Sequence, residues 1–127
     1  MIEFVVAGTP RSHQANSRSQ WQSTVAAAVP AAAQLLAGPL RLRIDFFYAD
    51  TTDLDTDNII KPIQDALENL VYENDKTVVD VCARRVDRKH LPQMVEPPAT
   101  LSDALVSTEG DFVFIRVATA HREVTFS

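Results

Sequence analysis

The sequence predicts an α/β domain in which two main helices cover a mixed sheet of about four strands, in the order β-α-β-α-β-β. Three observations support this prediction. The 127 residues suit one domain with a core of its own, spanning residues 1–127. Segments rich in β-branched and aromatic residues recur along the chain. Two longer segments with helical periodicity separate the first three of them, and helices that alternate with strands are expected to cover the sheet.

The first strand is predicted from Ile2 to Ala7, a short apolar run. The polar segment from Gly8 to Ser19 then forms either a solvated loop or a loop that contacts phosphate groups. A packed helix is expected from Gln20 to Leu36, and Pro30 predicts a kink or a break in it because proline opposes helical hydrogen bonding.

The next strand is predicted from Leu40 to Tyr48, where the side chains alternate clearly between two faces. Its two faces carry Leu40, Leu42, Ile44 and Phe46 on one side and Arg41, Arg43, Asp45 and Phe47 on the other. Further along, Thr77 to Val86 and Phe112 to Ala118 also predict strands.

Shorter elements are expected in the second half of the chain. The proline-rich segment from Leu91 to Thr100 is predicted to be extended or looped. One or two turns of helix are expected from Leu101 to Val106, with Ser102 as a possible cap. Val124 to Phe126 forms either a short ordered piece or a loose tail.

Between the second and third strands, the stretch from Asp55 to Asp75 contains an amphipathic helix with a charged outer face. At 100° per residue, five polar side chains fall within an arc of roughly 100°: Asp57, Lys61, Gln64, Asp65 and Glu68. The apolar residues occupy the opposite side. Asp57 and Asn58 are candidate N-cap residues, and Pro62 limits the regularity of the first turn.

The formal charge of −5 is unevenly distributed along the chain. From Asp50 to Asp80 there are nine acids and two lysines, a net charge of −7, whereas the remainder has ten bases and eight acids, a net charge of +2. A cation-binding site in a mildly basic shell would give this segregation, because bound divalent ions are the largest local charges. A plainly acidic surface is the alternative.

The acids suit Mg²⁺, with Mn²⁺ as a second possibility, because carboxylate oxygens are hard ligands. Zinc is disfavoured because the chain has one cysteine and three widely spaced histidines. Asp55 and Asp57 project to one side where the backbone is extended, and Asp75 could close the cluster from the neighbouring segment. Lys61 either forms an ion pair with Asp57 or Asp65, or reaches a phosphate.

Two other carboxylate motifs fit poorly. Asp53, Asp55 and Asp57 match the first ligands of an EF-hand loop, but Asn58 replaces the required glycine and Gln64 replaces the final glutamate. A phosphatase aspartate at the end of a buried strand is also disfavoured, because the residues before it are polar. The single Cys82, the lack of a signal peptide and the lack of a membrane-length apolar run predict a reducing, cytoplasmic setting.

The acidic stretch resembles the signature of RusA-type Holliday junction resolvases, which are crossover junction endodeoxyribonucleases. Their pattern is Asp-x-Asp-Asn, a lysine three residues later, Asp-Ala-Leu four residues further on, and an acidic pair shortly before a strand. The matching residues are Asp55, Asp57, Asn58, Lys61, Asp65, Ala66 and Leu67, with Asn74 and Asp75 at the position of the pair. The opening strand followed by Gly8, Thr9 and Pro10 also resembles the start of these proteins.

The resemblance implies a homodimer that cuts Holliday junctions or related branched DNA with Mg²⁺, in DNA recombination and repair. It implies that Asp55, Asp57 and Asp75 are metal ligands and that Lys61 lies near the scissile phosphate. A DNA-binding module of the same fold, with weak or lost catalysis, is the alternative function.

DNA contacts are assigned to basic residues because phosphate binding needs cations near the metal. These residues are Arg11, Arg18, Arg84, Arg85, Arg88 and Lys89. The dimer surface is expected to come from β-elements, with Phe47 and the strand from Phe112 to Ala118 as candidates. Phe47 is otherwise expected to be buried beneath a helix.

Overall fold

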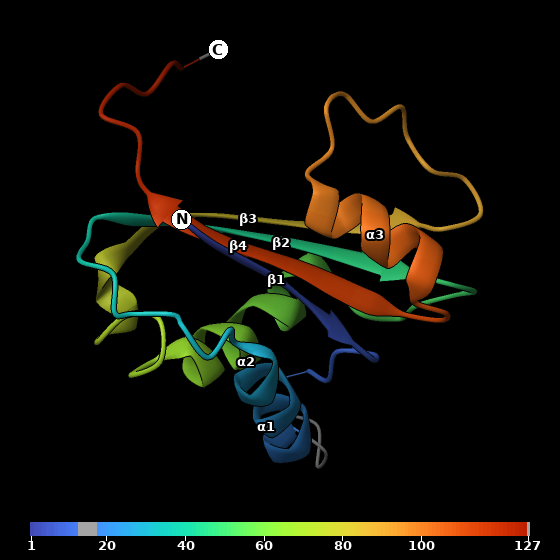
Figure 1. The fold of residues 1–127 in the computed structure, drawn as a ribbon, viewed down its shortest axis with the longest axis horizontal. Coiled ribbons are helices and arrows are strands. Elements are labelled where there is room, and N and C mark those ends of the chain that lie inside the picture. Colours follow the sequence, from blue (N-terminus) through green and yellow to red (C-terminus); the bar gives the residue numbers. More distant parts are fainter. Residues whose placement is uncertain (13–17, 127) are drawn as a thin grey trace.

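The computed structural model describes residues 1–12 and 18–126, so residues 13–17 of the predicted polar loop, His13 among them, lie outside the described part. Figure 1 shows a twisted sheet between two layers of helix, which confirms the predicted α/β class and the mixed sheet of four strands. The strands are β1 (Ile2–Ala7), β2 (Leu40–Tyr48), β3 (Val78–Asp87) and β4 (Phe112–Thr119). The helices are α1 (Arg18–Ala28), α2 (Thr56–Leu67), the short 3₁₀ turn η1 (Asp75–Thr77) and α3 (Ala99–Ser107).

The strands lie in the order β1-β4-β2-β3. β4 runs antiparallel to both of its neighbours, and β2 runs parallel to β3. Parallel neighbours need a crossover, and α2 provides it. Because the end of a parallel crossover must return to the start of the next strand, the 75–77 turn before β3 is brought back along α2.

One face of the sheet forms the main core with α1 and α2, which both lie below the sheet in Figure 1. The predicted alternation of β2 is confirmed, since Leu42, Ile44 and Phe46 are buried in this core. α1 contributes Trp21 and Val25 and ends at Ala28. The predicted helix to Leu36 was therefore too long, because the chain breaks before Pro30.

α2 packs through Ile59, Ile63 and Leu67, each fully buried. Asp55 rather than Asp57 or Asn58 occupies the N-cap position, in an extended conformation and without a side-chain capping bond. Pro62 is the seventh residue of the helix, so its missing N–H removes one hydrogen bond, to the Asn58 carbonyl, and the helix nevertheless continues to Leu67.

The other face of the sheet is partly covered by α3, which lies above it in Figure 1. Phe47 stacks on Phe112 with ring centroids 4.7 Å apart and is 2% exposed, which confirms that it lies beneath a helix. The prediction that Phe47 and Phe112–Ala118 supply an association surface is wrong. β4 is an interior strand whose apolar side chains are already buried on both faces.

The remaining elements differ slightly from expectation. α3 begins at Ala99 with Pro98 in the cap position, so Ser102 is not the cap. The segment predicted to be extended or looped, Leu91 to Thr100, has no regular helix or strand over residues 91–98, whereas its last two residues belong to α3. Residues 120–126 after β4 form no regular element.

Candidate metal centre

The outer face of α2 carries the charged side chains that the helical periodicity predicted. Lys61 lies in the middle of this face and donates from Nζ to Asp65 Oδ1 at 2.7 Å, one turn further along the helix. The same ammonium donates to Asp75 Oδ2 at 3.0 Å, fourteen positions away in sequence. Lys61 therefore links α2 to the turn before β3.

A tight chain reversal after α2 makes this contact possible. The helix ends at Leu67, whose carbonyl accepts hydrogen bonds from the N–H groups of Leu70 and Val71. Asn69 adopts a positive φ of 66°, a left-handed conformation that asparagine tolerates better than most residues. The chain then turns back along the helix, which returns Asp75 to the charged face.

Asn74 fixes the short turn that carries Asp75. Its side-chain oxygen accepts from the Lys76 N–H at 2.9 Å, and its carbonyl accepts from the Thr77 hydroxyl at 2.7 Å. An aspartate carboxylate could make the first of these bonds equally well, so Asn74 at the position of an acidic residue preserves the local geometry.

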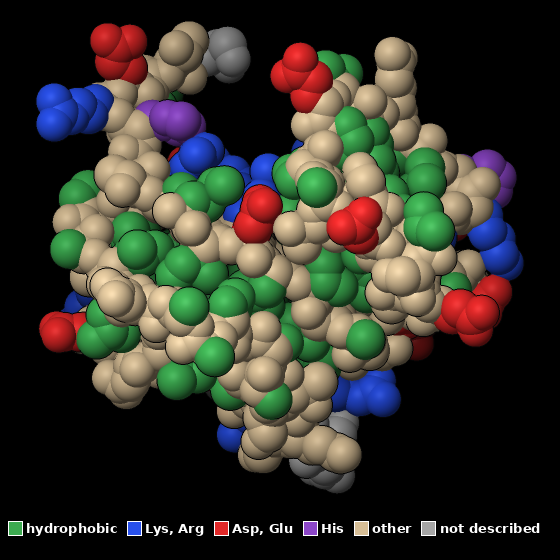
Figure 2. All heavy atoms as spheres, in the orientation of Figure 1, with side chains coloured by type: hydrophobic (Ala, Val, Ile, Leu, Met, Phe, Trp, Pro, Cys, Tyr) green, Lys and Arg blue, Asp and Glu red, His purple; other side chains and the backbone are tan. Residues whose placement is uncertain are grey.

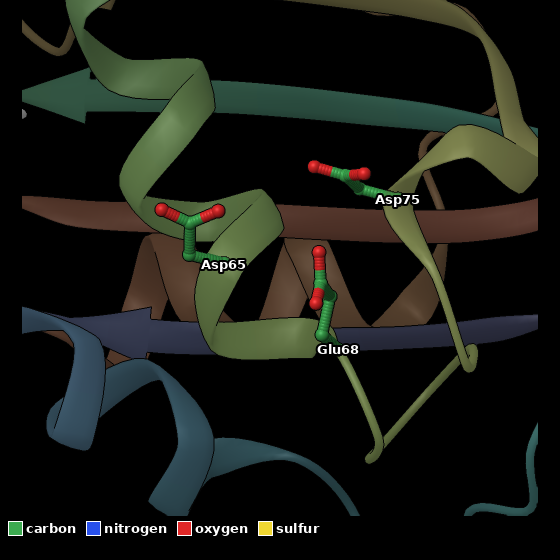
Figure 3. Close-up of side chains that lie close together, drawn as sticks. All are labelled: Asp65, Glu68 and Asp75. Carbon is green, nitrogen blue, oxygen red and sulfur yellow. The ribbon is translucent and has the colours of Figure 1, made fainter.

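Three carboxylates converge at the end of α2. Figure 3 shows Asp65 and Glu68 projecting from the helix and Asp75 projecting toward them from the returning segment. One oxygen of each lies within 4.8 Å of the others, and all three side chains are partly buried. Two oxygens on opposite sides of a Mg²⁺ ion lie about 4.2 Å apart, so small side-chain rotations would close the group around one ion.

The carboxylates of the cluster stabilise the positive charge of Lys61. Hydrogen bonds to Asp65 and then to Asp75 raise the pKa of Lys61 above its ordinary value, so the ammonium stays charged. Burial, followed by the charge of Asp75, raises the pKa of the Tyr72 phenol behind the cluster. Tyr72 therefore remains a neutral donor and binds the Gln64 carbonyl at 2.9 Å.

Asp55 and Asp57 lie at the opposite end of α2 and are exposed. Eight helical residues separate Asp57 from Asp65, a rise of about 12 Å. The expected grouping of Asp75 with Asp55 and Asp57 therefore differs from the carboxylate group found among the described residues. Lys61 lies between these two acidic groups, one turn after Asp57 on the same face of α2, and about half of its side chain is exposed to solvent.

The predicted DNA contacts divide into two groups in space. Arg85 donates to the Leu54 carbonyl at 3.1 Å, and Arg11 lies with Leu54 around one surface hollow, so both flank the entry to α2. Lys89 forms an ion pair with Asp50 at 2.9 Å in the same connection. Arg18 is the first residue of α1.

Arg84 and Arg88 face the other side of the sheet and have structural partners there. Arg84 Nε donates to the buried Asp45 at 2.6 Å. Arg88 donates to three backbone carbonyls at the end of α3 and in the following loop. Arg84 and Arg88 therefore lie apart from the entry to α2, and their role as DNA contacts stays a prediction.

Sequence reasoning missed two residues that build the site. Glu68 was placed on the charged face but not among the ligands, although its spacing of i+7 from Lys61 and i+3 from Asp65 indicates one surface. Asp111 was not singled out at all. It accepts from the Ala49 N–H at 2.8 Å and from the Thr9 hydroxyl at 2.7 Å, which ties together the loops that flank the entry to α2.

Comparison with known protein families gave a match over most of the chain. A family model described as "Endodeoxyribonuclease RusA" matches residues 4–95, which span β1 to β3 and include the whole acidic stretch. No significant match was found among curated proteins. No helix in the described ranges is long and apolar enough to cross a membrane.

Proposed function

Because the chain belongs to the RusA endodeoxyribonuclease family, we propose that it is a Mg²⁺-dependent endonuclease that cuts Holliday junctions or related branched DNA in recombination and repair. The observation that supports this most directly is the outer face of α2, where Asp65 and Asp75 hold the Lys61 ammonium beside a third carboxylate. This face brings hard oxygen ligands and a phosphate-binding cation to one exposed surface.

Two carboxylate sets that share Asp75 are candidate ligands of a divalent ion. Asp55, Asp57 and Asp75 form the set that the signature assigns, and Asp57 lies on the same helical face as Lys61. Asp65, Glu68 and Asp75 form the set whose oxygens already lie together. We propose that Asp55, Asp57 and Asp75 hold the catalytic ion, while Asp65 keeps Lys61 and Asp75 aligned.

When bound, the divalent ion supplies Lewis-acid stabilisation of the charge that develops on the phosphoryl oxygens. The residues of the chain position the DNA. Lys61 is exposed by about half of its side chain and keeps a full positive charge, so it can exchange a carboxylate for a phosphate oxygen. Arg11, Arg85 and Lys89 supply further cations around the entry to α2.

Cleavage of a synthetic four-way junction with Mg²⁺, compared with linear duplex of the same sequence, tests the activity. Junction cleavage that requires Mg²⁺ or Mn²⁺ would support the proposal. Asp57→Asn and Asp75→Asn are expected to abolish cleavage while the protein still binds the junction. Glu73→Gln is the matched control, since Glu73 is an exposed acid of the same stretch outside the cluster.

Paramagnetic broadening by Mn²⁺ distinguishes the two ligand sets. Asp57→Asn should remove the broadening if the signature set holds the ion, whereas Glu68→Gln should leave it in place. The reverse result would assign the ion to Asp65, Glu68 and Asp75. Tight junction binding by the wild-type protein without cleavage under any divalent ion would favour the binding-module alternative.

We also propose that the protein acts as a homodimer, because two equivalent sites related by a two-fold axis can cut two strands of a junction symmetrically. The apolar surface for association must lie outside β4 and Phe47, which are buried. Val79 on the edge strand β3 is 63% exposed and is available for such a contact. Light scattering at micromolar concentration, with and without junction DNA, tests the assembly, and a monomer in both states would contradict it.

A further inference from the structure

A pocket of about 310 Å³ opens on the face of the sheet opposite α2. Its floor comes from β2, β3 and β4, and its walls come from α3 and the 92–98 segment that leads into it. Figure 2 shows the surface hollowed beside α3, with basic side chains at the base of the hollow. The acidic face of α2 lies on the other side of the sheet, so the pocket has no part in the proposed nuclease site.

The floor of the pocket carries an excess positive charge. Asp45 is 4% exposed and accepts hydrogen bonds from Arg84 Nε at 2.6 Å and Arg116 Nη2 at 3.3 Å. One carboxylate therefore balances two guanidinium groups. Within the described residues, the two Nη groups of Arg84 have no acceptor, although Asp45 fixes the orientation of the guanidinium through Nε.

The walls of the pocket are mainly apolar. Met94, Val95 and Leu101 line it together with prolines of the 92–98 segment, and Gln93 is the one polar side chain among the lining residues of these walls. Val95 is 80% exposed at the rim, an unusual exposure for a bulky aliphatic side chain. An oriented guanidinium fork thus lies directly beside an open aliphatic surface.

We propose that this pocket binds a peptide segment of a partner protein that carries a carboxylate next to a bulky aliphatic side chain. The carboxylate would accept two hydrogen bonds from the Arg84 Nη groups, which is the preferred geometry of a guanidinium and a carboxylate. The aliphatic side chain would cover Met94 and Val95, and its burial supplies the apolar contribution to binding.

Two observations favour a peptide over DNA at this place. Binding along a DNA backbone requires several uncompensated cations, and the floor offers one net positive charge. Unpaired bases stack on exposed aromatic rings, but Phe47 and Phe114 in the floor are only 2% and 1% exposed.

The test uses short peptides and NMR chemical shifts of the full chain. N-acetyl-aspartyl-leucine amide, titrated to about 10 mM, should shift the methyl signals of Met94, Val95 and Leu101 in a saturable manner, since a dipeptide is expected to bind weakly. The asparaginyl-leucine and aspartyl-serine analogues should bind at least about fivefold more weakly, because each lacks one half of the recognised group. Equal binding of the analogues, or no shift with any peptide, would overturn the proposal.

Matched variants locate the site. Val95→Glu places a repelling carboxylate at the rim and should weaken binding by about tenfold, whereas Val106→Glu, at a 90% exposed position of α3 outside the pocket, should not. Both changes are at exposed side chains, so folding should be preserved. Equal effects of the two variants would contradict the assigned place.

A phosphodiester probe, thymidylyl-thymidine, completes the test. Stronger shifts with this probe than with the aspartyl peptide would overturn the proposal in favour of a nucleic-acid site. Junction cleavage by Val95→Glu should equal that of the wild type, so failure of the peptide proposal leaves the nuclease proposal intact.

Discussion

Arg88 provides the sharpest test of the structure against the sequence, because the two assign it different roles. In the sequence it belongs to a basic group expected to contact DNA. In the structure its guanidinium donates to the carbonyls of Leu105 at 3.1 Å, Thr108 at 2.8 Å and Gly110 at 2.5 Å, and lies 5.0 Å from the centre of the Phe112 ring. It therefore connects the end of β3 to the C-terminal end of α3, where unpaired carbonyls and the helix dipole favour a cation.

We expect Arg88→Ala to lower the free energy of unfolding by about 2–4 kcal/mol. A hydrogen bond to a charged group contributes about 1.5–3 kcal/mol, but the three bonds share one partly exposed group and do not add fully. The cation–π contact contributes roughly 0.5–1 kcal/mol. For a domain of this size, the loss corresponds to a fall in the melting temperature of about 8–16 °C.

Urea unfolding followed by circular dichroism measures this loss, with Arg122→Ala as a control because Arg122 is exposed in the segment after β4. Arg88→Lys should fall between the wild type and Arg88→Ala, since an ammonium keeps the charge but cannot reach all three carbonyls. The structural reasoning is wrong if Arg88→Ala unfolds like the wild type while the salt dependence of junction binding falls by about one phosphate equivalent.

Three further predictions concern other parts of the fold. Gly38→Ala should destabilise the protein by about 1–3 kcal/mol and weaken divalent-ion binding, because a Cβ there would lie 2.7 Å from the Thr77 Cβ and displace the turn that carries Asp75, a proposed metal ligand. Calorimetry measures both the stability and the ion binding. Asp45→Asn should lower the free energy of unfolding by roughly 2–4 kcal/mol, since two guanidinium groups lose their shared buried carboxylate. An unchanged midpoint of urea unfolding would contradict this, because it would show that water replaces the lost carboxylate as a partner of the two arginines. Two hydrogen bonds from Arg43 lower the pKa of Asp80, so the stabilisation from this ion pair should be present above the ordinary carboxyl pKa and disappear as the pH falls through the lowered pKa. The difference in free energy of unfolding between wild type and Asp80→Asn, measured from neutral to acid pH, should therefore vanish at the acid end.

Local patterns in the sequence determined most of the secondary structure. The alternation of β2 defines one apolar face, and the helical spacing of α2 defines a buried and a charged face. These faces are found as predicted, while Asp45 and Phe47 on the second face of β2 are buried as well. The signature around Asp55 to Asp75 also predicted the family that the chain belongs to. These inferences depend on neighbours in sequence, which is why they needed no knowledge of the tertiary arrangement.

The tertiary structure alone decided which distant residues meet. Sheet order places β4 in the interior, so its apolar side chains form a core instead of an interface. The reversal at Asn69 brings Asp75 to Lys61 in the middle of α2, a contact between residues fourteen positions apart that no local pattern specifies. Neighbouring arginines of one strand have different surroundings, because successive residues of a strand point to opposite faces of the sheet. Arg85 faces the entry to α2 while its neighbour Arg84 neutralises a buried carboxylate, and only the packing of the sheet distinguishes these two environments.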